Sequence, residues 1–251
     1  MTASQRTPGE GDLTHGVTVG EAMDFLLRAE IEVLGRMPWS SNQTFLAKLV
    51  VEGTEGLAIY KPRRGERPLW DFPEGTLCMR EVASYAISDA AGWAIVPPTI
   101  LRDGPYGEGM VQLFVDHDPD EHYLTLFREH VERFSDFAAF DIVVNNADRK
   151  SGHCLRARDG HIWGIDHGLT FHPAGKLRTV IWEYAGERLP QSVTESLDRL
   201  LSELNGDLGA RLTDLLSPEE AGLTTKRASR LLSTRRFPEP HSDYPFPWPM
   251  V

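Results

Sequence analysis

The chain has 251 residues, 41% of them apolar, which is ordinary for a globular protein of one large or two small domains. Asp and Glu total 37 against 26 Lys and Arg, and the resulting net charge of −11 argues against binding to nucleic acid or to anionic lipid. The two cysteines form no CxxC pair, which argues against a disulfide scaffold or a zinc knuckle. No signal-peptide core and no long apolar run occurs, so we expect a cytoplasmic protein without integral membrane association.

The N-terminal part of the chain has the pattern of a polar tail followed by a small sheet. Residues 1–17 are expected to be disordered because they offer almost nothing to bury. Thr18 and Glu21 match a capping box, so a helix should begin there and run to about residue 29. A second helix is expected over residues 77–91. The expected strands of this sheet are residues 31–35, 44–51, 57–61, 95–101 and 109–115.

An acidic break at residues 116–121 marks the expected boundary between two lobes. We expect an N-terminal lobe over residues 18–115, a C-terminal lobe over 116–235 and a tail over 236–251. The tail is rich in Pro and aromatic residues and should be extended, with Trp248 either packed on the body or available for contacts. The C-terminal lobe is expected to hold helices over residues 124–131, 134–144, 191–204, 208–216 and 218–233, and a hairpin over 154–156 and 162–165.

Two aspartates stand at the ends of elements in the second half of the chain. Asp148 lies in a polar loop after an apolar helix, and Asp166 ends a short strand directly before His167 and Gly168. In a two-lobed phosphotransferase, one aspartate orients or deprotonates the acceptor hydroxyl and a later one holds Mg²⁺ on the nucleotide. The alternative is that both are turn residues, because Asp can hydrogen-bond its own backbone. Asp141 is expected to brace the helix or loop rather than to react.

Three features of the first half fit the same interpretation. Ser40 and Ser41 lie in a turn between strands, where backbone N–H groups and hydroxyls can close over phosphates. Lys61 ends the third strand, from which it could reach the phosphates, and Glu81 in the next helix could pair with it. The simpler interpretations are a plain hairpin turn, a lysine that faces water and a glutamate that only suits the helix dipole. Neither a GxGxxG nor a Walker A motif is present.

Three motifs follow one another along the chain: Gln112-Leu113-Phe114-Val115, then Asn146-Ala147-Asp148-Arg149 with His153, then Asp166-His167-Gly168-Leu169-Thr170-Phe171. With them the chain resembles the phosphatidylinositol 3/4-kinase-like branch of the protein-kinase-like fold. It is most similar to type II phosphatidylinositol 4-kinases, more distantly to HipA-type bacterial kinases, and it looks like an actinobacterial group assigned to that branch. The resemblance covers roughly residues 31–171. It implies an α+β fold with a small antiparallel-sheet N-lobe and a mainly helical C-lobe.

The resemblance also implies roles for single residues. Asp148 matches the catalytic aspartate that orients the acceptor hydroxyl and takes its proton, and Arg149 matches the residue that fixes this catalytic loop. Asp166 matches the metal ligand, and the implied cofactors are ATP and Mg²⁺ or Mn²⁺. The implied ATP-binding positions are Ser40, Ser41, Lys61, Glu81, Gln112, Leu113, Phe114 and Val115.

One position departs from the family pattern. His153 lies five residues after Asp148, where this branch has a metal-binding Asn, and neutral imidazole favours Zn²⁺ or Mn²⁺ over Mg²⁺. The histidine therefore supports a single-metal site with Asp166, contacts phosphate, or marks a loss of activity. Three functions stay open: a kinase acting on a hydroxyl of a lipid headgroup, metabolite or protein; an inactive nucleotide-binding pseudokinase or scaffold; and an AMP transferase. Nothing in the sequence indicates the oligomeric state.

Overall fold

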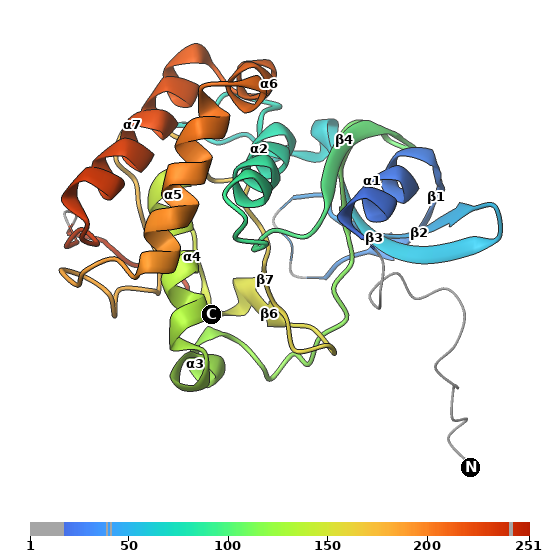
Figure 1. Ribbon diagram of the computed structural model, residues 1–251. Helices are drawn as coiled ribbons and strands as arrows, with labels where there is room; N and C mark the ends of the chain where they lie inside the picture. The colour runs from blue at the N-terminus through green and yellow to red at the C-terminus, as the bar shows by residue number, and fades with distance from the viewer. Residues whose placement is uncertain (1–17, 39, 41, 241–242) are drawn as a thin grey trace, which may run out of the picture.

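A sheet-based lobe and a helical lobe make up the part of the chain that the computed structural model describes: residues 18–38, 40, 42–240 and 243–251. In Figure 1 the sheet lies at the right, the helices α4, α5 and α7 lie at the left, and α2 lies between them. This is the two-lobed α+β arrangement that the sequence predicts. The lobe boundary expected at residue 115 stays a prediction, and the tail over residues 1–17 lies outside the described residues.

The sheet has five antiparallel strands in the order β1-β2-β3-β5-β4. Glu52 and Gly53 join β2 to β3 with φ angles of 50° and 83°. A two-residue hairpin turn needs positive φ angles at both positions if it is to match the twist of the strands. The predicted turn over residues 52–56 is therefore too long, because Thr54 already pairs with Val51. The strands are β1 (Glu30–Arg36), β2 (Phe45–Val51), β3 (Thr54–Pro62), β4 (Thr99–Gly104) and β5 (Gly107–Leu113).

Helix α1 (Val19–Arg28) packs on the sheet and closes a small core of its own. The predicted capping box is confirmed: the Glu21 N–H donates to the Thr18 hydroxyl, and the Thr18 N–H donates to the Glu21 carboxylate. Phe25 and Leu26 are buried against side chains of β2, β3 and β5. The buried face of this helix therefore packs mainly on the sheet, and Met23 also contacts the core of the helical lobe.

Strand β4 starts later than the sequence predicts. It begins at Thr99 instead of residue 95, and it continues to Gly104. Pro97 and Pro98 precede it, and since proline lacks a backbone N–H these residues cannot donate to the sheet. The apolar residues before the prolines, Ile95 and Val96, therefore do not belong to the strand. They are buried in the core of the helical lobe.

Helix α2 (Leu77–Ala90) matches its predicted range and connects the two lobes. Glu66 caps its first turn from the preceding loop, with carboxylate oxygens that accept hydrogen bonds from the N–H groups of Leu77 and Cys78. The buried face of α2, which includes Ile87, belongs to the same hydrophobic core as α4 and α5. Because α2 also packs against β4 and β5, it is held between the two lobes.

The helical lobe follows the predicted order, with one correction near its start. The helix predicted over residues 124–131 is a single turn, α3, continued as a 3₁₀ turn at Phe127–Glu129, and α4 begins at Val131 rather than at residue 134. Among the described residues, no helix is both long enough and apolar enough to cross a membrane. The elements of this lobe are α3 (Tyr123–Leu126), α4 (Val131–Val144), β6 (Cys154–Arg156), β7 (Ile162–Gly164), α5 (Gln191–Leu204), α6 (Asp207–Leu215) and α7 (Pro218–Thr234).

The C-terminal tail is held by its backbone and leaves aromatic side chains in solvent. The Pro245 carbonyl accepts hydrogen bonds from the Thr179 N–H and the Trp182 indole. The Met250 carbonyl accepts one from the Ser151 N–H, so the tail lies beside the loop that carries Asp148. Trp248 is 90% exposed, which leaves it available for contacts rather than packed on the body.

Candidate active site

An ammonium group between two carboxylates lies where the sheet meets the helical lobe. Lys61, near the end of β3, places its Nζ 2.5 Å from Glu81 Oε1 of α2 and 2.8 Å from Asp166 Oδ1. Burial opposes the charge on Lys61, but Asp166 and Glu81 outweigh it and raise the pKa of the lysine above its usual range. Burial raises the pKa of Glu81, whose other oxygen accepts a hydrogen bond from the His167 N–H. The structure thus brings together the lysine and glutamate that the sequence predicts to pair.

Asp166 follows β7 in a conformation that most residues avoid. Its φ is 61°, in the left-handed region, where a non-glycine residue is strained. The side chain is half exposed and faces Lys61, whose positive charge holds the pKa of Asp166 well below its usual range. The chain therefore maintains a charged carboxylate in a costly backbone geometry, which is typical of a functional position.

The loop after α4 presents Asp148 toward the same region. Asn145 caps the C-terminus of α4 and adopts a left-handed conformation with φ 51°. The Asn146 side chain accepts a hydrogen bond from the Asp148 N–H at 3.0 Å, so Asn146 and not Asp148 forms the Asx turn. The Asp148 carboxylate lies 3.3 Å from the Lys150 ammonium. Burial raises the pKa of Asp148 to about 6, although Lys150 opposes this shift.

Arg149 braces this loop from inside the protein. Its fully buried guanidinium makes an ion pair with Asp141, 2.9 Å from Nη2 to Oδ1, and the same nitrogen lies 2.6 Å from the His167 ring. Asp141 also accepts hydrogen bonds from Asn146 and from Thr179. Asp141 thus braces the loop, as the sequence predicts. Arg149 is buried behind the loop, so its contacts are those of a positioning residue.

His153 faces Asp166 through its Nε2 atom, at 3.6 Å from Oδ2. Burial lowers the pKa of His153 to about 4, so the ring is neutral at pH 7. Its Nδ1 accepts a hydrogen bond from the Lys150 N–H, which assigns the ring proton to Nε2. In this tautomer Nε2 carries the proton and would have to lose it before it could ligate a metal ion. The geometry therefore fits a hydrogen bond from His153 to an anion better than metal ligation.

A single open pocket contains the key side chains. It encloses about 820 Å³, counting the part that is open to solvent, and Lys61, Glu81, Asp148 and Asp166 all line it. The remaining lining comes mainly from the two segments that precede α2 and that follow Asp166. Four charged groups predicted from separate parts of the sequence thus share one cavity. The other residues around it are Asn42, Gln43, Pro62, Glu66, Arg67, Leu69, Leu77, Cys78, Gly168 and Leu169.

Among the described residues of the expected phosphate loop and adenine segment, Ser40 and residues 112–115 do not line this pocket, whereas Asn42 and Gln43 of the same turn as Ser40 do. Ser40 is hydrogen-bonded to the Thr44 hydroxyl at 2.7 Å, and Ser41 lies outside the described residues. The Gln112 side chain donates to Thr99 inside the sheet. Their assignment to ATP binding therefore stays a prediction.

The other residues of the adenine segment are partly committed to the fold. The Leu113 N–H donates to the Pro98 carbonyl, and the Phe114 N–H donates to the Leu57 carbonyl. Val115 is buried, and its carbonyl is hydrogen-bonded to His117. Of the three, Val115 alone has no hydrogen bond from its N–H to another described residue.

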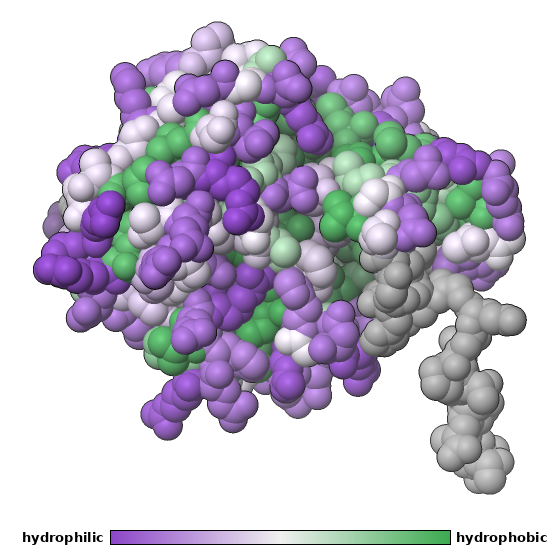
Figure 2. Space-filling model, viewed as in Figure 1, coloured by the Kyte–Doolittle hydropathy of each residue, from purple (hydrophilic) through white to green (hydrophobic). Residues whose placement is uncertain are grey.

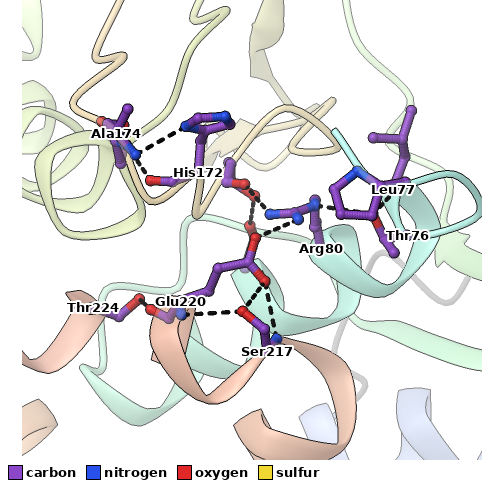
Figure 3. Close-up of polar contacts among 12 residues, drawn as sticks. Thr76, Leu77, Arg80, His172, Ala174, Ser217, Glu220 and Thr224 are labelled. Carbon is purple, nitrogen blue, oxygen red and sulfur yellow. Dashed lines mark hydrogen bonds and ion pairs between the residues drawn. The ribbon is translucent and has the colours of Figure 1, made fainter. Parts of the chain in front are cut away.

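A second buried arginine holds α2 in place, directly before Glu81. Figure 3 shows the Arg80 guanidinium between two elements of the helical lobe: it donates to the Thr170 carbonyl at 2.6 Å and pairs with Glu220 of α7. Glu220 in turn forms the capping box of α7 with Ser217. Arg80 thereby ties together α2, the segment after Asp166 and α7. It also holds in place its neighbour on α2, Glu81, which lines the pocket.

Several of these residues were not predicted from the sequence. Lys150 follows Asp148 by two positions, and its charge beside a carboxylate was a usable signal. Arg80 and Glu220 had no such signal, because 140 positions separate them and neither belongs to a motif. Glu66 likewise reaches α2 from a loop of no regular structure.

Comparisons with known proteins agree with this arrangement. Protein Rv2133c of Mycobacterium tuberculosis (strain ATCC 25618 / H37Rv) is 39% identical over 263 residues, which cover 89% of this chain and 93% of that protein. Phosphatidylinositol 4-kinase gamma 4 of Oryza sativa subsp. japonica is 31% identical over 166 residues, 59% of this chain but 27% of that protein. The family model of phosphatidylinositol 3- and 4-kinase matches residues 99–208. The chain belongs to the phosphatidylinositol 3/4-kinase-like branch of the protein-kinase-like fold.

A solved structure supports the kinase-like fold over nearly the whole chain. The Helicobacter pylori proinflammatory kinase CtkA aligns with 91% of this chain and 96% of its own, with a TM-score of 0.50 and 12% identity. At that identity the likeness concerns the fold. The kinase-like family supports a phosphotransferase function. The family model covers Asp148 and Asp166, but its match begins at residue 99 and so does not include Lys61 or Glu81.

Proposed function

We propose that the protein is an ATP-dependent phosphotransferase that moves the γ-phosphate to a hydroxyl acceptor. The observation that carries the proposal is the pocket in which Lys61, Glu81, Asp148 and Asp166 meet. A charged lysine held by two carboxylates is what a nucleotide's phosphates require, and a third carboxylate remains for the acceptor. Catalysis in this class consists mainly of positioning and charge stabilisation, for which rigidly held groups are suited.

Asp166 is the residue that would hold Mg²⁺ or Mn²⁺. Its carboxylate is ionised and half exposed, and one carboxylate suffices for Mg²⁺, which otherwise takes water and phosphate oxygens. Among the described residues, no group of three His, Cys, Asp or Glu side chains could hold a metal alone, so the nucleotide would complete the site. When bound, the ion supplies neutralisation of the phosphate charges. In this proposal His153 donates a hydrogen bond from Nε2 and does not ligate the ion.

Asp148 is the proposed base. With a pKa of about 6 its carboxylate is ionised at pH 7 yet basic enough to accept a proton. It orients the acceptor hydroxyl; as the acceptor oxygen bonds to the γ-phosphorus, the bond to the β-phosphate oxygen breaks and ADP leaves. The hydroxyl proton passes to Asp148. Lys150, 3.3 Å away, stabilises the carboxylate before transfer and keeps it aimed at the pocket.

Recognition of adenine is assigned to the segment that ends in Val115. Its N–H has no acceptor among the described residues and is thus available to the base. Leu113 and Phe114 use their N–H groups within the fold, so their contribution would come from carbonyls or side chains. Ser40 and Ser41 remain the proposed hydroxyl donors to the phosphates.

A nucleotide-binding pseudokinase is the second candidate, and His153 motivates it. The branch carries a metal-binding Asn at this position, whereas the Nε2 of His153 is arranged as a hydrogen-bond donor. Such a protein would bind ATP but would not turn it over.

Thermal unfolding with ATP and Mg²⁺, measured beside ADP release over a screen of hydroxyl acceptors, tests the proposal. Lys61→Met should abolish stabilisation by ATP, whereas Lys48→Met, on the same sheet but paired with Glu55, should keep it. ATP binding without ADP release would identify a pseudokinase. The intact mass of the modified acceptor separates phosphoryl from adenylyl transfer. If ATP stabilises the Lys61→Met variant as well as the parent protein, the nucleotide site is wrong.

A further inference from the structure

A second cavity lies behind the catalytic loop, between the end of α4, helix α7 and the start of the C-terminal tail. It holds about 1480 Å³, counting the part open to solvent, against about 820 Å³ for the candidate active site. Asn145, which lines this cavity, directly precedes Asn146 and lies three residues before Asp148. None of the residues that line this cavity is among those that line the candidate active site.

The walls of this cavity are apolar on several sides. The apolar lining residues are Ile142 of α4, Leu177 and Trp182 of the segment between β7 and α5, Leu231 of α7 and Phe237 of the tail. Leu231 and Phe237 are only 3% exposed, so their positions are fixed by packing. Walls of this kind bind a hydrocarbon or aromatic group in a pre-formed space.

Three arginines stand at the same cavity. Arg227, Arg230 and Arg236 line it together with a single acid, Glu239, and none of the three makes an ion pair with another described residue. This concentration of positive charge occurs in a chain with a net charge of −11. Figure 2 shows strongly hydrophilic residues, with apolar ones between them, over the end of α7 that lies at the left of Figure 1.

One of these arginines is held in place before any ligand arrives. Arg227 donates from Nε to the Val143 carbonyl at 2.8 Å and from Nη2 to the Thr224 hydroxyl at 3.0 Å. These acceptors are neutral, and burial lowers the pKa of Arg227 to about 10, a shift that Glu220 opposes only in part. Its Nη1 has no hydrogen bond to another described residue. The Arg236 guanidinium is anchored similarly, at the Gly186 carbonyl.

We propose that this cavity binds a small amphipathic anion, with its carboxylate or phosphate on the arginines and its apolar part against the partly exposed Ile142, Leu177 and Trp182 side chains. Guanidinium groups match the planar fork of a carboxylate and the oxygens of a phosphate. The apolar walls select against inorganic phosphate, and the arginines select against neutral hydrocarbons. The site is separate from the proposed nucleotide pocket and does not depend on that proposal.

Isothermal titration of the full chain with octanoate and with octyl phosphate tests the site. Inorganic phosphate and octanol serve as the two halves of the ligand. Octanoate or octyl phosphate should bind at least about tenfold tighter than either half, since both the charge-assisted hydrogen bonds and the apolar walls contribute. The better of the two headgroups then identifies the preferred anion. Equal binding of a half ligand, or no binding of either amphiphile at millimolar concentration, overturns the proposal.

Variants locate the binding. Arg230 is exposed on α7, so Arg230→Glu should leave the fold intact and weaken binding by about tenfold or more, the loss typical of a hydrogen bond to a charged group. Arg211→Glu, an equally exposed arginine on α6 outside the cavity, is the matched control and should bind normally. Binding that survives Arg230→Glu but disappears in Lys61→Met would assign the ligand to the active-site pocket and overturn the proposal.

Discussion

Two sets of charges in this protein lie close together but differ in how completely they are compensated. Behind the pocket, Arg149 pairs with Asp141, and Arg80 pairs with Glu220; these groups are almost completely buried and each charge has a partner. Inside the pocket, Asp166 is half exposed, while Asp148 has a raised pKa and a lysine at 3.3 Å. The buried pairs hold the geometry, and the open carboxylates retain charge for ligands.

The difference teaches that the same residue types serve unequal purposes according to burial. Removing one member of a buried pair strands the other charge in a medium of low polarity, which costs stability. Removing an open carboxylate strands nothing, so the fold survives while chemistry is lost. The following variants separate these two outcomes.

The largest effect should come from Asp148→Asn. Loss of the base should reduce ADP release by about 10²–10⁴-fold, the usual range for a positioned general base. Because burial raises the pKa of Asp148 to about 6, the ionised carboxylate slightly opposes folding at pH 7, and the amide should unfold no earlier than the parent protein. Asp198→Asn, on an exposed face of α5, is the control for the assay. Turnover within threefold of the parent would contradict the assignment of Asp148.

Arg149→Met should destabilise the protein by about 3–5 kcal/mol, because the fully buried Asp141 loses its ion partner. Urea unfolding measures this loss. Arg149→Met combined with Asp141→Asn should lose less than the single variant, since no charge is left alone in the core. Equal losses in the two variants would show that the stranded charge is not the cause.

Glu220→Gln should cost about 1.5–3 kcal/mol, the range of a hydrogen bond to a charged group, since Arg80 keeps only its bonds to neutral partners. The looser α2 should also raise the KM for ATP, because Arg80 precedes Glu81 on the same helix. Glu219→Gln, the exposed neighbour on α7, should change neither quantity measurably. A stability loss without any change in KM would restrict the Arg80–Glu220 pair to a structural role.

The smallest effect concerns pH. Activity should rise with pH through about 6, because Asp148 must lose its proton before it can accept one, and it should fall below that value. Lys150→Met removes the cation that lowers the pKa of Asp148, so the midpoint should move upward by about one pH unit. A kcat profile against pH measures this. An unchanged or lower midpoint in Lys150→Met would mean that another group controls the profile.

Much of the fold and the chemically distinctive residues were accessible from the sequence. Lys61 at a strand end, Glu81 on the next helix and the two aspartates occur in an order that the topology imposes, so their meeting in one pocket could be anticipated. The assignment of catalytic and ATP-binding roles to them stays a prediction. The capping box at Thr18 was equally readable, because it depends on residues three positions apart.

The rest depended on contacts between distant segments. Nothing near Arg80 indicates that its partner is Glu220, because that pairing follows from how α2 and α7 pack. The tautomer of His153 depends on the N–H of Lys150, a backbone direction that residue identity does not encode. The apolar run before Pro97 was mistaken for strand, since burial alone does not distinguish sheet from core.

The way α2 is packed determines how the pocket can open. Its main buried face is part of the helical core, whereas its contact with the sheet is the smaller cluster of Cys78, Val82 and Met110. Under the proposed function, opening of the pocket between β3 and α2 would therefore part Lys61 of the sheet from Glu81. Each opening and closing of the pocket would break and re-form the Lys61–Glu81 ion pair, which links the sheet to α2. Amide hydrogen exchange in α2 should accordingly resemble that of α4 and not that of the sheet.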